Sequence, residues 1–164
     1  MTPPMAELAA APVTPSRRAC TAVTRYAGAL VLLAVGLDHL EQYTADSYSA
    51  IPTIGTLFLV NFIAAAALAL ALTAPVERLP GRAGRVAIPL LAAGGIGVAA
   101  GSLVGVIVSE STGLFGFMET GYRSSIVVSI ALEVVTIMLL LAHLVLRLPS
   151  AGAVRPAPRP QRVP

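Results

Sequence analysis

Four polar or ionisable residues follow an uncharged run near the N-terminus. Residues 36–43, GLDHLEQY, place Asp38, His39, Glu41 and Gln42 directly after YAGALVLLAV. Carboxylates and an imidazole can bind a cation or exchange protons. Neighbouring residues of a helix point about 100° apart, however, so this cluster is poorly arranged to surround one metal ion. We therefore predict no metal site here and interpret the stretch as the rim of a polar pocket.

A second polar group lies in a strongly apolar segment near the C-terminus. At about 100° per residue, five polar residues fall within an arc of about 80° on one helix face: Ser125, Ser129, Glu133, Thr136 and His143. With a rise of about 1.5 Å per residue, Glu133 lies roughly 12 Å inside the end of its helix. An acidic group at the centre of a membrane costs about 2.5–3.5 kcal/mol, so Glu133 needs a polar partner.

Asn61 and Ser102 fall at a similar depth and are the candidate partners of Glu133. The predicted pocket consists of Asp38, His39, Asn61, Ser102, Ser129, Glu133 and Thr136. The alternative is structural: a neutral Glu133 fastens two helices by a hydrogen bond, while the polar groups of residues 36–43 are wetted at the membrane boundary. The sequence leaves both interpretations open.

Other chemistry is not indicated by the sequence. By helix rise, His39 and His143 lie roughly 20 Å apart along the membrane normal, too far to ligate one haem. Cys20 is the single cysteine, which excludes an intramolecular disulfide. Nucleophile motifs, phosphate loops and dinucleotide fingerprints are missing from the sequence. We predict no catalytic residues and no cofactor, and an enzyme is the less favoured class.

The elements that would hold these residues are four apolar segments. The chain has 164 residues, of which 56% are hydrophobic and 12% are charged, and its mean hydropathy is +0.83. Uncharged runs occur at about 26–43, 54–72, 86–108 and 126–146. Helices of about 18–23 residues reach roughly 27–35 Å, enough for a hydrocarbon layer of about 30 Å. The prediction is an all-α bundle of four transmembrane helices.

Arginine positions predict the orientation. All 11 basic residues are arginines, and every one except Arg123 falls before the first segment, between the second and third, or after the fourth. The positive-inside rule places both termini in the cytoplasm. Arginine without lysine, together with abundant Ala, Gly and Pro, suggests a GC-rich bacterial genome, so the membrane is expected to be a bacterial plasma membrane. Residues 25–147 form the membrane domain. The Pro/Ala/Arg-rich tails, 1–24 and 148–164, are expected to be disordered.

A strip of small residues marks the third segment. Gly97, Gly101 and Gly105 recur every four residues, with Gly94 on the same face. Such a GxxxG strip predicts close packing against another helix, either of this chain or of a second copy. The loop after this segment, residues 109–125, interleaves aromatic residues with glycines. We expect it to lie on the bundle and to cap the pocket.

Two stretches carry a resemblance to known proteins. IPTIGTLFLVNF and STGLFGFMETGYR resemble uncharacterised small four-span membrane proteins of actinobacteria, over about residues 36–123. This resemblance implies a fold and no activity. A weaker similarity, in size and number of spans only, is to DoxX-like four-helix membrane proteins, some of which are linked to quinone or thiol redox chemistry.

The expected function is that of a non-enzymatic accessory or scaffold protein. The alternatives are a small transporter or proton-coupled component that uses Glu133, and a quinone-linked redox subunit. Expected partners are the lipid bilayer and either a second copy of the chain or another membrane protein. The net charge of +3 reflects topology. We therefore predict no nucleic-acid partner.

Overall fold

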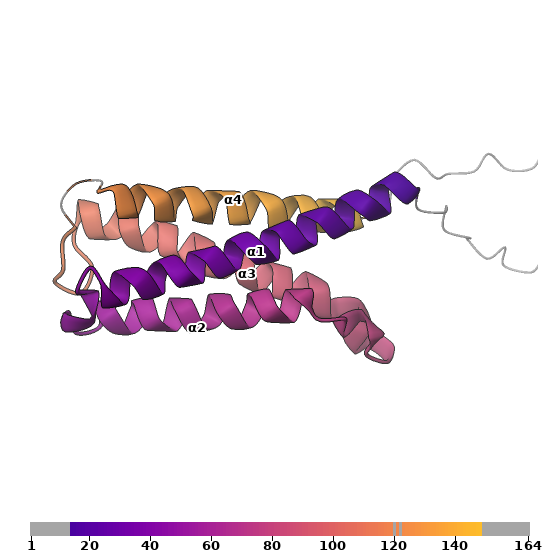
Figure 1. The fold of residues 1–164 in the computed structure, drawn as a ribbon, viewed down its shortest axis with the longest axis horizontal. Coiled ribbons are helices and arrows are strands. Elements are labelled where there is room, and N and C mark those ends of the chain that lie inside the picture. The colour runs from indigo at the N-terminus through magenta and orange to yellow at the C-terminus, as the bar shows by residue number, and fades with distance from the viewer. Residues whose placement is uncertain (1–13, 120, 122, 149–164) are drawn as a thin grey trace, which may run out of the picture.

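A computed structural model describes residues 14–119, 121 and 123–148 (Figure 1). Its long helices are α1 (Pro15–Thr44), α2 (Ile54–Thr73), α3 (Gly81–Ser111) and α4 (Ser124–Arg147). Short 3-10 helices, η1 (Tyr48–Ala50) and η2 (Val76–Arg78), lie in two of the connections. Each long helix is long and apolar enough to cross a membrane. The prediction of an all-α chain with four candidate membrane helices is confirmed.

Two helices extend beyond the predicted segments. α1 begins at Pro15, so residues 15–24 are helical and the expected disordered tail of 1–24 is incorrect over that part. Pro15 suits a first helical position, where a missing N–H costs nothing. Thr21 and Thr24 bond back to the carbonyls four residues earlier, which lets polar residues continue the helix. α3 likewise contains the whole predicted segment 86–108. The remaining predicted tails, 1–13 and 149–164, lie outside the described residues.

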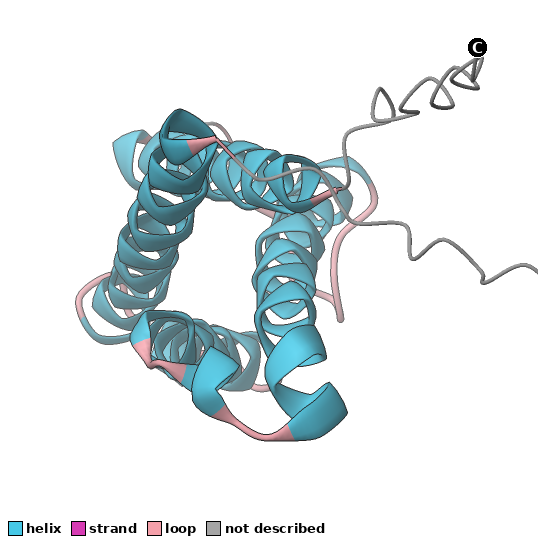
Figure 2. Cartoon of the chain, turned by 90° about the vertical axis from the view of Figure 1, so that its right-hand side faces the viewer, coloured by secondary structure: helices cyan, strands magenta, loops and turns pink. Residues whose placement is uncertain are grey.

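The four helices run alternately up and down and stand around a common axis (Figures 1 and 2). α1 packs extensively on both α2 and α4, whereas α2 and α3 make the smallest contact between neighbouring helices. The start of α1, η2 and the end of α4 lie at one end of the bundle, here called the η2 end. η1 and the α3–α4 loop lie at the other, here called the η1 end.

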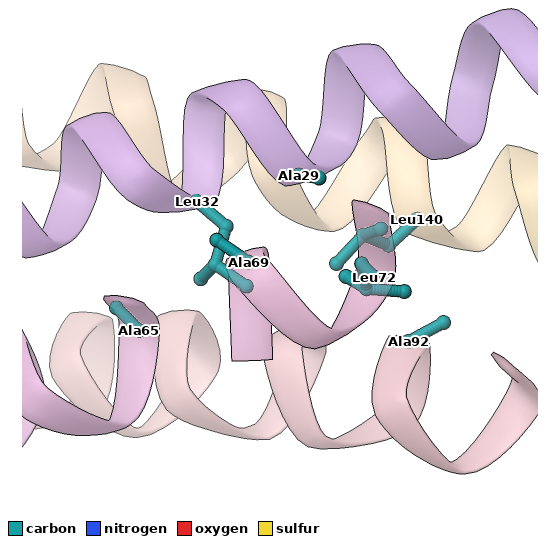
Figure 3. Close-up of a cluster of buried hydrophobic side chains, with 7 residues drawn as sticks. All are labelled: Ala29, Leu32, Ala65, Ala69, Leu72, Ala92 and Leu140. Atoms are coloured by element: carbon teal, nitrogen blue, oxygen red, sulfur yellow. The ribbon is translucent and has the colours of Figure 1, made fainter. Parts of the chain in front are cut away.

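The apolar core receives side chains from all four helices. Its buried members are Ala29, Leu32, Ala65, Ala69, Leu72, Ala92 and Leu140 (Figure 3). Glycines allow the closest approaches. A Cβ on Gly95 would lie 2.8 Å from Leu140 and 2.9 Å from Leu32, and one on Gly28 would lie 2.6 Å from Leu140. Close contact between small residues and large apolar side chains supplies the dispersion energy that holds helices together in lipid.

The predicted glycine strip mostly does not make such a contact. A Cβ on Gly94 would lie 3.2 Å from Leu68, but at Gly97 and Gly101 it would meet nothing within 4 Å, and at Gly105 only Leu114 at 4.0 Å. α3 instead buries its other small-residue face, with Ala92, Gly95 and Ala99. The prediction that the strip packs closely against a helix of this chain is therefore wrong beyond Gly94. Spacing identifies a smooth face but cannot say which of two smooth faces is covered.

Candidate functional site

A cavity of about 330 Å³ lies between α2 and α3 near the η1 end. Its walls are mainly apolar and include Leu57 and Phe58 of α2, Val98 and Val106 of α3, and Ile126 of α4. Polar side chains also line it, and His39, Asn61 and Ser102 lie among them on the facing helices α1, α2 and α3; the others are Gln42, Tyr48, Ser109 and Glu119. A largely apolar hollow of this size with a few polar groups is the usual form of a small-molecule site.

His39 joins α1 to α3 at the floor of the cavity. Its Nδ1 lies 2.9 Å from the Val35 carbonyl oxygen, and its Nε2 lies 2.9 Å from the Ser102 hydroxyl. A carbonyl only accepts, so Nδ1 carries the hydrogen, and Nε2 of the neutral ring accepts from Ser102. The ring also lies against Phe58, with centroids 5.2 Å apart. Contacts on three sides fix the orientation of the imidazole.

Glu133 lies directly behind this pair. Its side chain is fully buried at 0% exposure, and its Oε1 is 3.8 Å from His39 Nε2. Ser102 is close by. Within the described chain, however, neither carboxyl oxygen reaches hydrogen-bond geometry with a partner. Asn61 Oδ1 and Thr136 Oγ1 are likewise buried and unpartnered there. The structure thus brings His39, Asn61 and Ser102 together around the cavity, but no hydrogen bond joins Asn61 to Glu133 among the described residues.

Asp38 and Ser129 form a separate clamp between α1 and α4. The Ser129 hydroxyl donates to Asp38 Oδ2 at 2.5 Å. Gln42 Nε2 donates to the same carboxylate oxygen at 2.8 Å and to Ser129 Oγ at 2.7 Å. Neither Asp38 nor Ser129 lines the cavity. Asp38, Gln42 and Ser129 thus fasten α1 to α4 through side-chain hydrogen bonds, the kind of role that the structural alternative gave to Glu133.

A second polar cluster, the Tyr48 latch, covers the cavity at the η1 end. It consists of Tyr48, Glu119 and Arg123. The Tyr48 hydroxyl donates to Glu119 Oε2 at 2.5 Å and accepts from Arg123 at 2.6 Å, while Arg123 and Glu119 form an ion pair at 3.3 Å. Burial, followed by the bond to Glu119, raises the pKa of Tyr48, which keeps its phenol neutral. The Tyr48 ring stacks on Phe58 with centroids 4.5 Å apart.

The latch was only partly foreseen in the sequence. The loop after α3 was expected to cap the pocket, and its Phe117 and Glu119 do line the cavity. Thr120 and Tyr122 of this loop lie outside the described residues. The role of Tyr48 was missed. The only signal in the sequence is an aromatic residue within a short polar connection. In the structure, the preceding residue, Ser47, has a positive φ of 65°, which sets the turn.

The exposed part of the cavity lining faces sideways. Leu57 and Val60 on α2 are 41% and 54% exposed, and Gly97 and Gly101 on α3 are exposed as well. These four residues border the gap between α2 and α3, the two neighbouring helices with the smallest contact. For helices that cross a membrane, this side faces lipid. The cavity is thus covered by the latch toward the η1 end and open laterally.

Toward the η2 end the polar residues are interrupted. Leu32, Leu72 and Leu140 are each 0% exposed and fill the bundle between Thr136 and His143. Beyond them, His143 Nδ1 lies 2.9 Å from the Thr21 carbonyl oxygen, and its Nε2 is buried without a hydrogen-bond partner in the described region. The polar stripe of α4 is therefore divided into two sections by an apolar layer.

Arg25 closes the η2 end of the bundle. It is 7% exposed, and its guanidinium donates to the Leu72 and Ala74 carbonyl oxygens at 2.6 Å each and to Glu77 at 3.1 Å. Carbonyls at the end of a helix have no partners within the helix. Arg25 supplies partners at the end of α2 and ties α1 to it.

Across residues 14–119, 121 and 123–148, no group of three or more His, Cys, Asp or Glu side chains is placed to hold a metal ion. No protein-family model, curated protein or solved structure matches this chain.

Proposed function

We propose that this chain is a non-enzymatic accessory protein of a bacterial plasma membrane, with both termini in the cytoplasm, that binds a small amphipathic molecule taken from the lipid. The membrane assignment rests on four long apolar helices. The orientation rests on the arginines, because the start of α1, η2 and the end of α4, which carry Arg17, Arg78 and Arg147, lie at the η2 end, whereas Arg123 directly precedes the start of α4 at the η1 end.

The lateral cavity is the observation that carries the binding function. Its walls match the apolar body of a ligand, and its floor offers His39, Asn61 and Ser102 to a polar head. The latch covers the end that faces water in this orientation. A molecule dissolved in the outer leaflet would therefore reach the site between α2 and α3 without crossing the aqueous phase.

The apolar layer of the core favours binding over conduction. A proton or substrate path would have to pass Leu32, Leu72 and Leu140, which are fully buried and have no polar atoms in their side chains. Moving an ion through such a layer requires water or a chain of polar groups. A transporter built on Glu133 would need a second conformation in which this layer opens.

Native mass spectrometry of the protein released from nanodiscs of bacterial lipid tests the proposal. We expect a small-molecule adduct to remain on the wild-type protein. Gly101→Phe should remove it, because Gly101 lines the cavity and a Cβ there meets no neighbour within 4 Å, which leaves room for the ring at the lateral opening. Val104→Phe is the matched control, since Val104 is 59% exposed on the same helix and does not line the cavity. Retention of the adduct in Gly101→Phe, or its equal loss in both variants, contradicts a ligand in this cavity.

A further inference from the structure

The polar atoms at the cavity floor are mostly hydrogen-bond acceptors. Asn61 Oδ1 is buried without a partner in the described chain. The Ser102 hydroxyl donates its one hydrogen to His39 Nε2, so the Ser102 oxygen can only accept a further hydrogen bond. The one imidazole N–H of the neutral His39 ring is committed to the Val35 carbonyl. A ligand head that only accepts hydrogen bonds would therefore find a donor in the Asn61 amide nitrogen but none in Ser102 or His39.

The charged residues near the cavity floor also favour a ligand that donates hydrogen bonds or carries a positive charge. Glu133 lies behind His39 and Ser102 as a fully buried carboxyl with two unpartnered oxygens in the described residues. Arg123, the arginine at the η1 end, is bound to Tyr48 and Glu119 in the latch. Arg25 is held by α2 carbonyls and Glu77 at the far end. Buried polar atoms normally have partners, so this arrangement lacks a donor, and a cation would satisfy it best.

Aromatic faces add to this preference. Phe58 and Tyr48, stacked on each other, both line the cavity, and Phe58 also contacts His39. The face of an aromatic ring attracts a cation, most strongly where water is excluded. The Phe58 ring lies against His39 at the floor, where the head of an amphipathic ligand would lie.

We infer that the cavity takes a lipophilic amine, whose protonated nitrogen is held at the floor by Asn61 and Ser102 with the Glu133 carboxylate as its counter-charge. The inference rests on the proposed function, because it names the chemical class of the molecule that the lateral cavity would bind. Attraction between opposite charges is strong in a low-dielectric bundle, so Glu133 acts on the ammonium without lining the cavity.

Three probes with one apolar body and different heads test the inference: phenylbutylamine, phenylbutanol and phenylbutyrate. Binding to the full-length protein in nanodiscs is measured for wild type, Glu133→Gln and Gly101→Phe. In the wild type we expect the amine to bind about tenfold more tightly than the alcohol, the effect expected of one charge-assisted hydrogen bond, and the carboxylate to bind most weakly. Glu133→Gln should remove the preference for the amine, because Gln keeps the shape of Glu and carries no charge.

The outcomes separate the two proposals. If the alcohol binds and Gly101→Phe abolishes its binding, the cavity is a ligand site whatever the preference for the head. Equal or tighter binding of the carboxylate, or an amine preference that survives in Glu133→Gln, then overturns the amine inference alone. If none of the probes binds the wild type, or if Gly101→Phe leaves all binding intact, the proposed binding function fails and the inference fails with it.

Discussion

Two glycines of α3 lie six residues apart in opposite surroundings. A Cβ on Gly95 would come within 2.9 Å of both Leu140 and Leu32, whereas one on Gly101 would meet nothing within 4 Å. Gly95 lies in the close-packed part of the bundle, where all four helices contribute to the core. Gly101 borders the cavity, where α2 and α3 separate.

The difference indicates that one region of the bundle holds the helices together and another keeps a cavity open. In lipid, apolar side chains gain little by leaving the bilayer for one another. The helices are therefore held together mainly by the close packing of small residues. The packed region supplies this, together with the Arg25 cap at the η2 end. The cavity region instead keeps open space and unpartnered polar atoms, which weaken a fold unless something binds there.

The largest expected change in stability comes from replacing Gly95, and the same replacement at Gly101 should have little effect. Gly95→Leu forces a side chain into the contact between Leu32 and Leu140 and should lower the free energy of unfolding by about 3 kcal/mol. Gly101→Leu should change it by less than about 0.5 kcal/mol, because the cavity has room. Unfolding titrations in mixed micelles measure both. Equal losses would mean that the two regions are packed alike.

Removing the Arg25 cap should come next. Arg25→Leu removes the guanidinium donor of the Leu72 carbonyl and one of the two donors of the Ala74 carbonyl, which keeps the Val76 N–H, and should cost about 2 kcal/mol in the same titration. Arg18→Leu, at an exposed position of the same helix, is the control and should be nearly neutral. If Arg25→Leu were as mild as the control, water or lipid headgroups would be satisfying the end of α2.

Replacing Glu133 should change the stability of the protein in the opposite direction. Glu133→Leu replaces a buried carboxyl that has no hydrogen-bond partner in the described chain, so it should raise the stability of the empty protein by about 1 kcal/mol. Val134→Leu, 45% exposed beside it, should leave stability unchanged. A loss of about 1 kcal/mol in Glu133→Leu, without a loss in Glu133→Gln, would restore Glu133 as a helix fastener.

The helices were predictable from the sequence because length and hydropathy alone define a membrane span. The depth of Asn61, Ser102 and Glu133 followed from helix rise, and two of these residues do line one cavity. The rotation of each helix could not be derived in the same way. It decides that α3 buries Gly95 rather than Gly101, and that Asp38 turns to Ser129 while the adjacent His39 turns to Ser102. The contacts of Tyr48 depend on loop geometry, which no periodicity encodes.

Closure of the cavity toward water can be tested with one cysteine. Gly105→Cys, in a Cys20→Ala background, places a thiol on the cavity wall, where a Cβ touches only Leu114. We expect slow reaction with an impermeant maleimide in intact cells, and reaction several-fold faster when Tyr48→Ala removes the centre of the latch. Thr112→Cys, exposed in the loop, should react quickly in both backgrounds. Fast reaction of Gly105→Cys with the latch intact would show that the cavity is open to water.

The smallest effect should be a pH dependence at the η2 end, where Glu77 meets Arg25. A backbone hydrogen bond and then the Arg25 guanidinium lower the pKa of Glu77 below its ordinary value of 4.5. A carboxylate with a lowered folded-state pKa stabilises the fold at pH values above its ordinary pKa, and this contribution is lost as pH falls through the lowered pKa. The Glu77 side chain is 50% exposed, so solvent screens the pair and the effect is small. Wild-type stability should therefore fall slightly more than that of Glu77→Gln between pH 6 and pH 3, with the two curves converging at the acid end. Parallel curves over that interval would show that Arg25 acts through the α2 carbonyls alone.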